Sequence, residues 1–181
     1  MRFIKLLAGL FLILTLQANA QGIPQPADII LKNALAKADK EHKKVFLIFH
    51  ASWCGWCHKM DNTMNNDTCK SLFNDNYVIA HITVLESKEK KELENPGGEE
   101  MLKKYNGDKG GIPFWLIFDP AGNLLADSQI RPAGASISEP GKNVGCPSEK
   151  EEVIYFIKVL KETSRLKQDQ LDLIQQAFSK K

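Results

Sequence analysis

The stretch VFLIFHASWCGWCHKM, residues 45–60, contains the two signals that decide the fold. Residues 45–49 form a short, continuous apolar run rich in strand-forming side chains, which is typical of a central strand covered on both faces. The C-G-W-C stretch follows at once, and from Cys54 the pattern predicts a helix to about Met64. We therefore expect a buried strand that leads two cysteines directly to the start of a helix.

That placement favours thiol chemistry. The unpaired N–H groups and the positive dipole end of a helix N-terminus both favour a thiolate at Cys54. Redox cysteines in such places have pKa values of about 3.5 to 7.5, against about 8.5 for an ordinary thiol. Cys57 lies one turn further on, where it can attack a mixed disulfide held on Cys54. We expect Cys54 to be the nucleophile and Cys57 the resolving thiol, with Trp53 and Trp56 as an apolar platform beside them.

Two other chemistries use the same residues. Cys54, Cys57 and His58 also match the attachment pattern of a c-type haem, with Met60, Met64 and Met101 as candidate distal ligands. A small haem domain is usually helical, however, whereas here a buried strand leads into the motif. A structural zinc site typically needs two cysteine pairs, and the sequence has one.

The remaining pattern is read from apolar periodicity and from Gly, Pro, Asn and Asp clusters. It predicts helices over 27–40, 99–105, 153–160 and 171–178, strands over 77–85, 114–118 and 124–130, a turn at 119–123 and a long loop over 131–147. A strand–helix–strand unit pairs in parallel, and the hairpin of the last two strands is antiparallel. We expect an α/β fold with a mixed central sheet, helices on both faces and an extra C-terminal helix.

Some finer features are also predicted. Asp67 is a candidate cap for a helical piece that carries Cys69, and Ser148 with Glu151 reads as a capping box. The charged run 86–94 reads as a solvated connector or helix end. Cys69 is expected to be a buried core thiol, with a Cys69–Cys146 disulfide left open as an alternative.

The first 20 residues read as a secretory signal peptide. Arg2 and Lys5 precede a short apolar run, and Ala18-Asn19-Ala20 provides a small-residue cleavage site. We expect cleavage after Ala20, a periplasmic or secreted protein, no stable membrane insertion afterwards, and a single domain over 21–181 whose core spans about 31–160. In an oxidising compartment, cysteine pairs tend to become disulfides.

Charge gives no sign of a nucleic-acid partner. The full chain has 24 Lys and Arg against 22 Asp and Glu, and the signal peptide carries two of the basic residues and no acid. The remaining chain is therefore neutral, which leaves no electrostatic footprint for nucleic acid or an anionic membrane.

The stretches VFLIFHASWCGWCHKM and GGIPFWLIFDPAGN together resemble the thioredoxin superfamily, and within it the secreted bacterial thioredoxin-like proteins with a W-C-G-W-C motif. The resemblance implies that Pro113 is a cis proline facing the redox helix and that Ile112 offers its backbone to a substrate polypeptide. The sequence also differs from that of cytoplasmic thioredoxins at two positions. The buried Asp of cytoplasmic thioredoxins corresponds to Ile48, and their lysine on the neighbouring strand to His81, so water, His81 or another group must take the Cys57 proton.

We therefore expect a protein-disulfide oxidoreductase that exchanges dithiols and disulfides with protein substrates, without a cofactor or metal. A membrane redox partner would supply or remove electrons. Gly55 and Ile112 resemble the reducing members, which favours a reductase or isomerase. The alternative from another class is a redox-inactive thioredoxin-fold binding module. His50 and His58 are expected to be a structural and a solvated residue, and His81 a strand residue with a satisfied partner.

Overall fold

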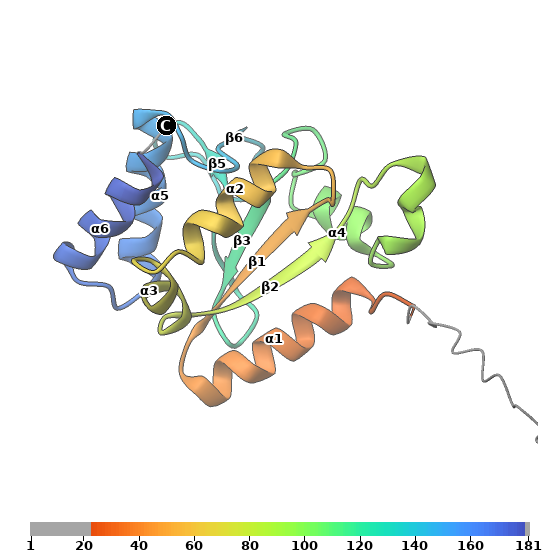
Figure 1. Ribbon diagram of the computed structural model, residues 1–181, viewed down its shortest axis with the longest axis horizontal. Helices are drawn as coiled ribbons and strands as arrows, with labels where there is room; N and C mark the ends of the chain where they lie inside the picture. The colour runs from red at the N-terminus through yellow and green to blue at the C-terminus, as the bar shows by residue number, and fades with distance from the viewer. Residues whose placement is uncertain (1–22, 180–181) are drawn as a thin grey trace, which may run out of the picture.

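A computed structural model of the chain describes residues 23–179 (Figure 1). The predicted signal peptide lies outside these residues. The elements follow one another in the order α1 (Ala27–Glu41), β1 (Lys44–His50), α2 (Gly55–Met64), α3 (Lys70–Asn74), β2 (Tyr77–Thr83), the 3-10 helix η1 (Lys88–Leu93), α4 (Gly98–Lys104), β3 (Phe114–Phe118), β4 (Leu124–Asp127), β5 (Gln129–Ile130), β6 (Lys142–Asn143), α5 (Lys150–Thr163) and α6 (Gln168–Phe178).

The central sheet is mixed, as the sequence predicts. Its strand order is β2-β1-β3-β4. β1 pairs in parallel with β2 and antiparallel with β3, and β3 pairs antiparallel with β4. The five apolar residues 45–49 of β1 and all five residues of β3 are buried, because both strands lie inside the sheet and are covered on both faces.

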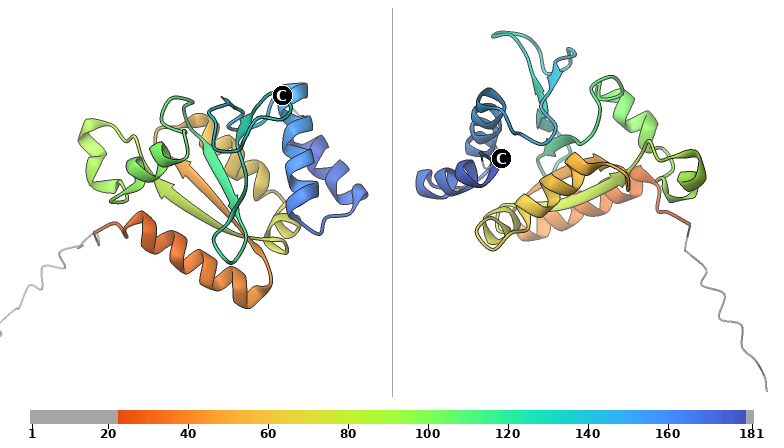
Figure 2. Two further views of the ribbon diagram at one scale, coloured as in Figure 1. Left: turned by 180° about the vertical axis from the view of Figure 1, so that it is seen from behind. Right: turned by 45° about the horizontal axis from the view of Figure 1, so that its top comes forward.

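Helices cover both faces of the sheet (Figures 1 and 2). Alternate side chains of β1 point to opposite faces. Phe46 and Ile48 pack with α2, α3, α5 and α6 in one core cluster. Val45, Leu47 and Phe49 pack with α1 and α4 in the other. The fold is thioredoxin-like, with a C-terminal helix, as expected.

Several predicted boundaries and caps are wrong, each for a local reason. The strand predicted to reach Leu85 ends at Thr83, and Leu85 has a positive φ of 55°. Asn66, not Asp67, caps the turn before α3, because its side-chain oxygen accepts hydrogen bonds from the N–H groups of Thr68 and Cys69. The capping box of α5 pairs Glu149 with Glu152, one residue beyond the predicted pair.

The predicted strand over 124–130 and the loop that follows it are also corrected. The strand stops at Asp127, and Gln129–Ile130 forms β5, which pairs with β6 in a separate two-stranded sheet. The segment 131–147 is therefore not only a loop. A buried ion pair between Arg131 and Asp127, with nitrogen and oxygen 2.6 Å apart, holds its start against the end of β4.

Candidate functional site

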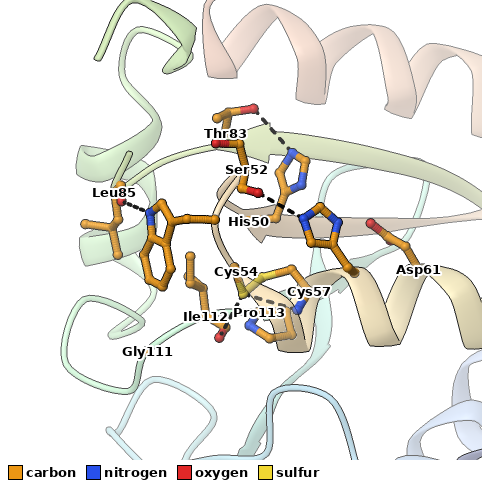
Figure 3. Close-up of a disulfide and its surroundings, with 12 residues drawn as sticks. His50, Ser52, Cys54, Cys57, Asp61, Thr83, Leu85, Gly111, Ile112 and Pro113 are labelled. Carbon is orange, nitrogen blue, oxygen red and sulfur yellow. Dashed lines mark hydrogen bonds between the residues drawn. A yellow bond between two sulfur atoms is a disulfide. The ribbon is translucent and has the colours of Figure 1, made fainter. Parts of the chain in front are cut away.

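The two cysteines lie where β1 ends and α2 begins. β1 ends at His50, and α2 starts at Gly55, immediately after Cys54. β3 runs antiparallel to β1, so its first residues lie beside the last residues of β1. This arrangement brings the Ile112–Pro113 bond next to the cysteines, although some 60 residues separate them in sequence (Figure 3).

Cys54 and Cys57 are joined by a disulfide. Cys54 is the N-cap of α2, and its sulfur accepts a hydrogen bond from the Cys57 N–H at 3.1 Å. In the reduced protein, this N–H and the helix dipole would stabilise a thiolate on Cys54. Cys54 is only 3% exposed and Cys57 1%. A substrate sulfur must therefore come into close contact with the protein surface around Cys54 to reach the disulfide.

The Ile112–Pro113 peptide bond is cis, as predicted. The carbonyl oxygen of Ile112 lies 3.5 Å from the sulfur of Cys54. Gly111, which precedes Ile112, has a φ of 75°, a conformation that a residue with a side chain rarely adopts. The backbone of this loop thus lies directly against the sulfur.

Trp53 and Trp56 flank the disulfide and remain 59% and 53% exposed. The indole N–H of Trp53 donates to the Leu85 carbonyl at 2.8 Å (Figure 3). The ammonium of Lys59 lies 4.9 Å from the centre of the Trp56 ring. Both rings are held in place and present apolar surface, which is compatible with the predicted platform; their contact with a substrate remains a prediction.

A groove of about 220 Å³ opens beside Trp56, Ile112 and Pro113. Its other wall comes from Asn143 at the end of β6 and from the segment that follows, including Cys146. This segment was predicted only as a loop, so sequence reasoning missed its part in the site.

Glu86 was also missed. The charged run 86–94 is predicted to be solvated, but Glu86 is only 5% exposed. Its two carboxylate oxygens accept hydrogen bonds from the N–H and the hydroxyl of Ser52, two residues before Cys54. No local pattern separates Glu86 from its charged neighbours, because its burial depends on Ser52, 34 residues earlier.

Three histidines lie in the elements around the disulfide: His50 ends β1, His58 is in α2 and His81 is in β2. His81 has a hydrogen-bonding partner, as predicted: Asp61 of α2, with Nε2 and Oδ1 2.9 Å apart, which the sequence did not identify. The ring of His50 lies 5.0 Å from that of His81. Burial, followed by the neighbouring His81, lowers the pKa of His50 below its usual value. His58 is exposed, as predicted, and also donates to the Ser52 carbonyl at 2.9 Å.

Cys69 and Cys146 are both buried. Over residues 23–179, no disulfide joins them, so the alternative left open by the sequence is not realised. Burial raises the pKa of the Cys146 thiol to about 11, which makes it a poor nucleophile near neutral pH.

Residues 23–179 contain neither a cluster of metal-ligating side chains nor a membrane-spanning helix. No three His, Cys, Asp or Glu side chains within this range lie close enough together to hold a metal ion. No helix of the described part is both long and apolar enough to cross a membrane.

The chain is similar to proteins of known family and structure. A family model described as thioredoxin-like matches residues 28–120. No curated protein matches the chain. Solved structures that it resembles include a disulphide isomerase from Xylella fastidiosa Temecula1, with 25% identity over 60% of this chain and 80% of that chain and a TM-score of 0.45. A DsbH oxidoreductase has 21% identity over 85% and 95% of the two chains, with a TM-score of 0.43.

A thioredoxin from Thermus thermophilus has 18% identity over 76% of this chain and 83% of that chain, with a TM-score of 0.44.

Proposed function

Because the chain belongs to the thioredoxin-like family, we propose that it is a thiol–disulfide oxidoreductase that acts on disulfides of protein substrates. One observation carries the proposal. The Cys54–Cys57 pair lies at the N-terminus of α2 and faces a cis Ile112–Pro113 bond. This arrangement supports thiolate chemistry at Cys54 and the binding of a polypeptide along the backbone beside it.

The exchange proceeds in two balanced steps. In the reduced enzyme, the Cys54 thiolate attacks one sulfur of a substrate disulfide, and the other substrate sulfur leaves as a thiolate. The Cys57 thiol then loses its proton and attacks the sulfur of Cys54. This second step forms the Cys54–Cys57 disulfide and releases the second substrate thiolate. The substrate gains two electrons, and its two thiolates are protonated by the proton that Cys57 releases and by one from water. An external dithiol must reduce the enzyme again.

The proton of Cys57 needs an acceptor in a site that has Ile48 where thioredoxins keep a buried Asp. Asp61 lies four residues after Cys57 on α2, so the two share one face of the helix. Asp61 is also paired with His81. We assign this pair as the acceptor of the Cys57 proton, through water if needed.

The direction we propose is reduction or isomerisation of substrate disulfides. Gly55 and Ile112 resemble the corresponding residues of the reducing members of the family. If the first 20 residues direct export, the protein works in the periplasm or outside the cell. A membrane thiol transporter would then be the partner that supplies its electrons.

The test is reduction of insulin disulfides with dithiothreitol as the electron donor. The wild-type protein is expected to accelerate the reaction, and Cys54→Ser to abolish the acceleration. Cys57→Ser is expected to accumulate a mixed disulfide on Cys54, because the resolving thiol is missing. Cys69→Ala removes a cysteine away from the site and serves as the control that retains activity. A Cys54→Ser variant as active as the wild type would contradict the proposal and favour a binding module.

A further inference from the structure

Asn143 holds the backbone that faces the disulfide. Its side-chain amide nitrogen donates to the carbonyl oxygens of Gly110 at 3.0 Å, Gly111 at 2.9 Å and Pro113 at 3.1 Å. The fourth carbonyl of this run, that of Ile112, instead lies against the Cys54 sulfur. One side-chain nitrogen therefore lies within hydrogen-bond distance of three of four consecutive carbonyl oxygens. The remaining carbonyl, that of Ile112, lies beside the Cys54 sulfur (Figure 3).

The orientation of the amide is determined by its other atom. The Asn143 Oδ1 accepts a hydrogen bond from the Gly145 N–H at 3.1 Å. If the amide were reversed, its oxygen would face three carbonyl oxygens and its nitrogen would face an N–H donor. Only the observed orientation pairs donors with acceptors on both sides.

The two segments also approach each other too closely for most side chains. A Cβ added to Gly110 would lie 2.7 Å from the Cβ of Asn143. Gly145 has a φ of 59°, and a Cβ added there would lie 3.2 Å from the Pro113 carbonyl oxygen. Glycine at both positions permits the contact that brings the Asn143 amide within hydrogen-bond distance of the loop.

The backbone around Asn143 is fixed by hydrogen bonds to other parts of the fold. It is part of β6, where it pairs with Gln129 of β5. The Val144 N–H donates to the Ser128 carbonyl at 2.7 Å, and the indole N–H of Trp115 donates to the Gly145 carbonyl at 2.9 Å. The amide thus extends from a fixed support that is anchored to β3 and to the end of β4.

We propose that Asn143 is a positioning residue for substrate binding: it fixes the Gly110–Pro113 backbone so that Ile112 is presented, beside Cys54, to an extended segment of a protein substrate. The inference rests on the proposed function. It goes beyond the family match, which ends at residue 120 and does not include Asn143. Because Asn143 does not touch the sulfurs, it should affect the binding of a polypeptide and not the reactivity of the thiols.

The experiment compares two substrates. Insulin must lie along the loop, whereas Ellman's reagent is a small disulfide that needs only access to Cys54. For Asn143→Ala we expect the KM for insulin to rise about tenfold, as expected when hydrogen bonds that preorganise a site are lost. The rate of the reduced variant with Ellman's reagent should stay within about twofold of the wild type, since the Cys57 N–H and the dipole of α2 remain. Asn143→Asp keeps the size of the side chain but turns an acceptor toward the three carbonyls, and it should raise KM at least as much.

The matched control is Asn76→Ala. The Asn76 amide also joins two backbone segments, donating to the Leu72 carbonyl and accepting from the Arg165 N–H, both at 2.9 Å, but it touches none of the site residues. It should lower thermal stability about as much as Asn143→Ala and leave the KM for insulin unchanged.

The outcomes separate the two claims. An unchanged KM in both Asn143 variants, or an equal rise in Asn76→Ala, would overturn the positioning role while the proposed function stands. An equal loss with insulin and with Ellman's reagent would also overturn it, because the defect would then lie in the thiols. A wild-type protein that does not reduce insulin at all would refute the proposed function itself, and this inference with it.

Discussion

Glu86 shows how much a single residue outside the C-G-W-C motif contributes to the site. Both of its carboxylate oxygens are used by Ser52, and its own N–H donates to the Glu94 carboxylate at 2.7 Å. A buried carboxylate is costly unless hydrogen bonds satisfy it, and here they fix the loop between β1 and Cys54. Glu86 therefore connects the start of the charged segment 86–94 to the loop that carries Cys54.

Replacing Glu86 by Gln tests this connection. The amide oxygen can still accept from the Ser52 N–H, and the amide nitrogen can donate to the Ser52 hydroxyl, but both hydrogen bonds lose the negative charge that strengthens them. We expect the free energy of unfolding to fall by about 1–2 kcal/mol, because a hydrogen bond to a charged group contributes about 1.5–3 kcal/mol and a neutral one about 0.5–1.5 kcal/mol. Urea unfolding followed by circular dichroism measures the change.

The control is Glu92→Gln in the same charged segment. Glu92 is exposed, so this substitution should change the free energy of unfolding by less than about 0.5 kcal/mol. If the two variants lose the same stability, the Glu86–Ser52 contact does not contribute as described.

At the scale of the elements, α6 completes the core on the face of the sheet that carries the redox helix. Phe178 packs on Phe156 of α5, with ring centres 4.9 Å apart, and on Phe73 of α3, with ring centres 6.4 Å apart. The same cluster contains Met60 and Met64 of α2. The C-terminal helix thus supports the helix that begins at Cys54.

Phe178→Ala should destabilise the protein by about 3–5 kcal/mol, because it leaves a cavity among aromatic rings. Guanidinium unfolding gives the value. Ile154→Ala on α5 is the matched control, since Ile154 is 53% exposed and its loss should cost less than about 0.5 kcal/mol. If the free energy of unfolding of Phe178→Ala falls only slightly, α6 does not contribute to the core as described.

Elements with strong local patterns could be predicted from the sequence. β3 spans the predicted residues 114–118, because FWLIF can be satisfied only between two covering layers. α2 follows Cys54 as predicted, since the apolar positions Cys57, Met60 and Met64 recur at helical spacing and are all buried. The cis bond at Pro113 followed from the family resemblance.

What the sequence did not predict depends on distant contacts. Asn143 was read as part of a loop, because nothing near it indicates hydrogen bonds to residues some 30 positions earlier. The strand expected over 124–130 changes partner at Ser128. The Ser128 N–H still donates to the Trp115 carbonyl of β3, whereas the Ser128 carbonyl accepts from the N–H of Val144, which follows β6. Such features depend on contacts between residues far apart in the sequence, so they cannot be predicted from local periodicity.

For the whole molecule, a thioredoxin-like sheet brings two cysteines and a cis proline together, and added segments support both. We propose that Cys54 and Cys57 form a reversible redox centre for protein disulfides. Cys69 and Cys146 are buried and are not part of this centre. Because a redox centre gains and loses electrons, a redox titration tests the proposal.

The purified protein would be equilibrated in graded thiol–disulfide buffers, alkylated and weighed intact, with peptide mapping to locate the modified thiols. We predict one reversible two-electron step that maps to Cys54 and Cys57, with a midpoint of about −200 to −270 mV, as in glutaredoxins and thioredoxins. A midpoint near about −120 mV would keep the redox centre but make the protein an oxidant, against the proposed direction. A protein in which the Cys54–Cys57 pair shows no reversible step would contradict the account.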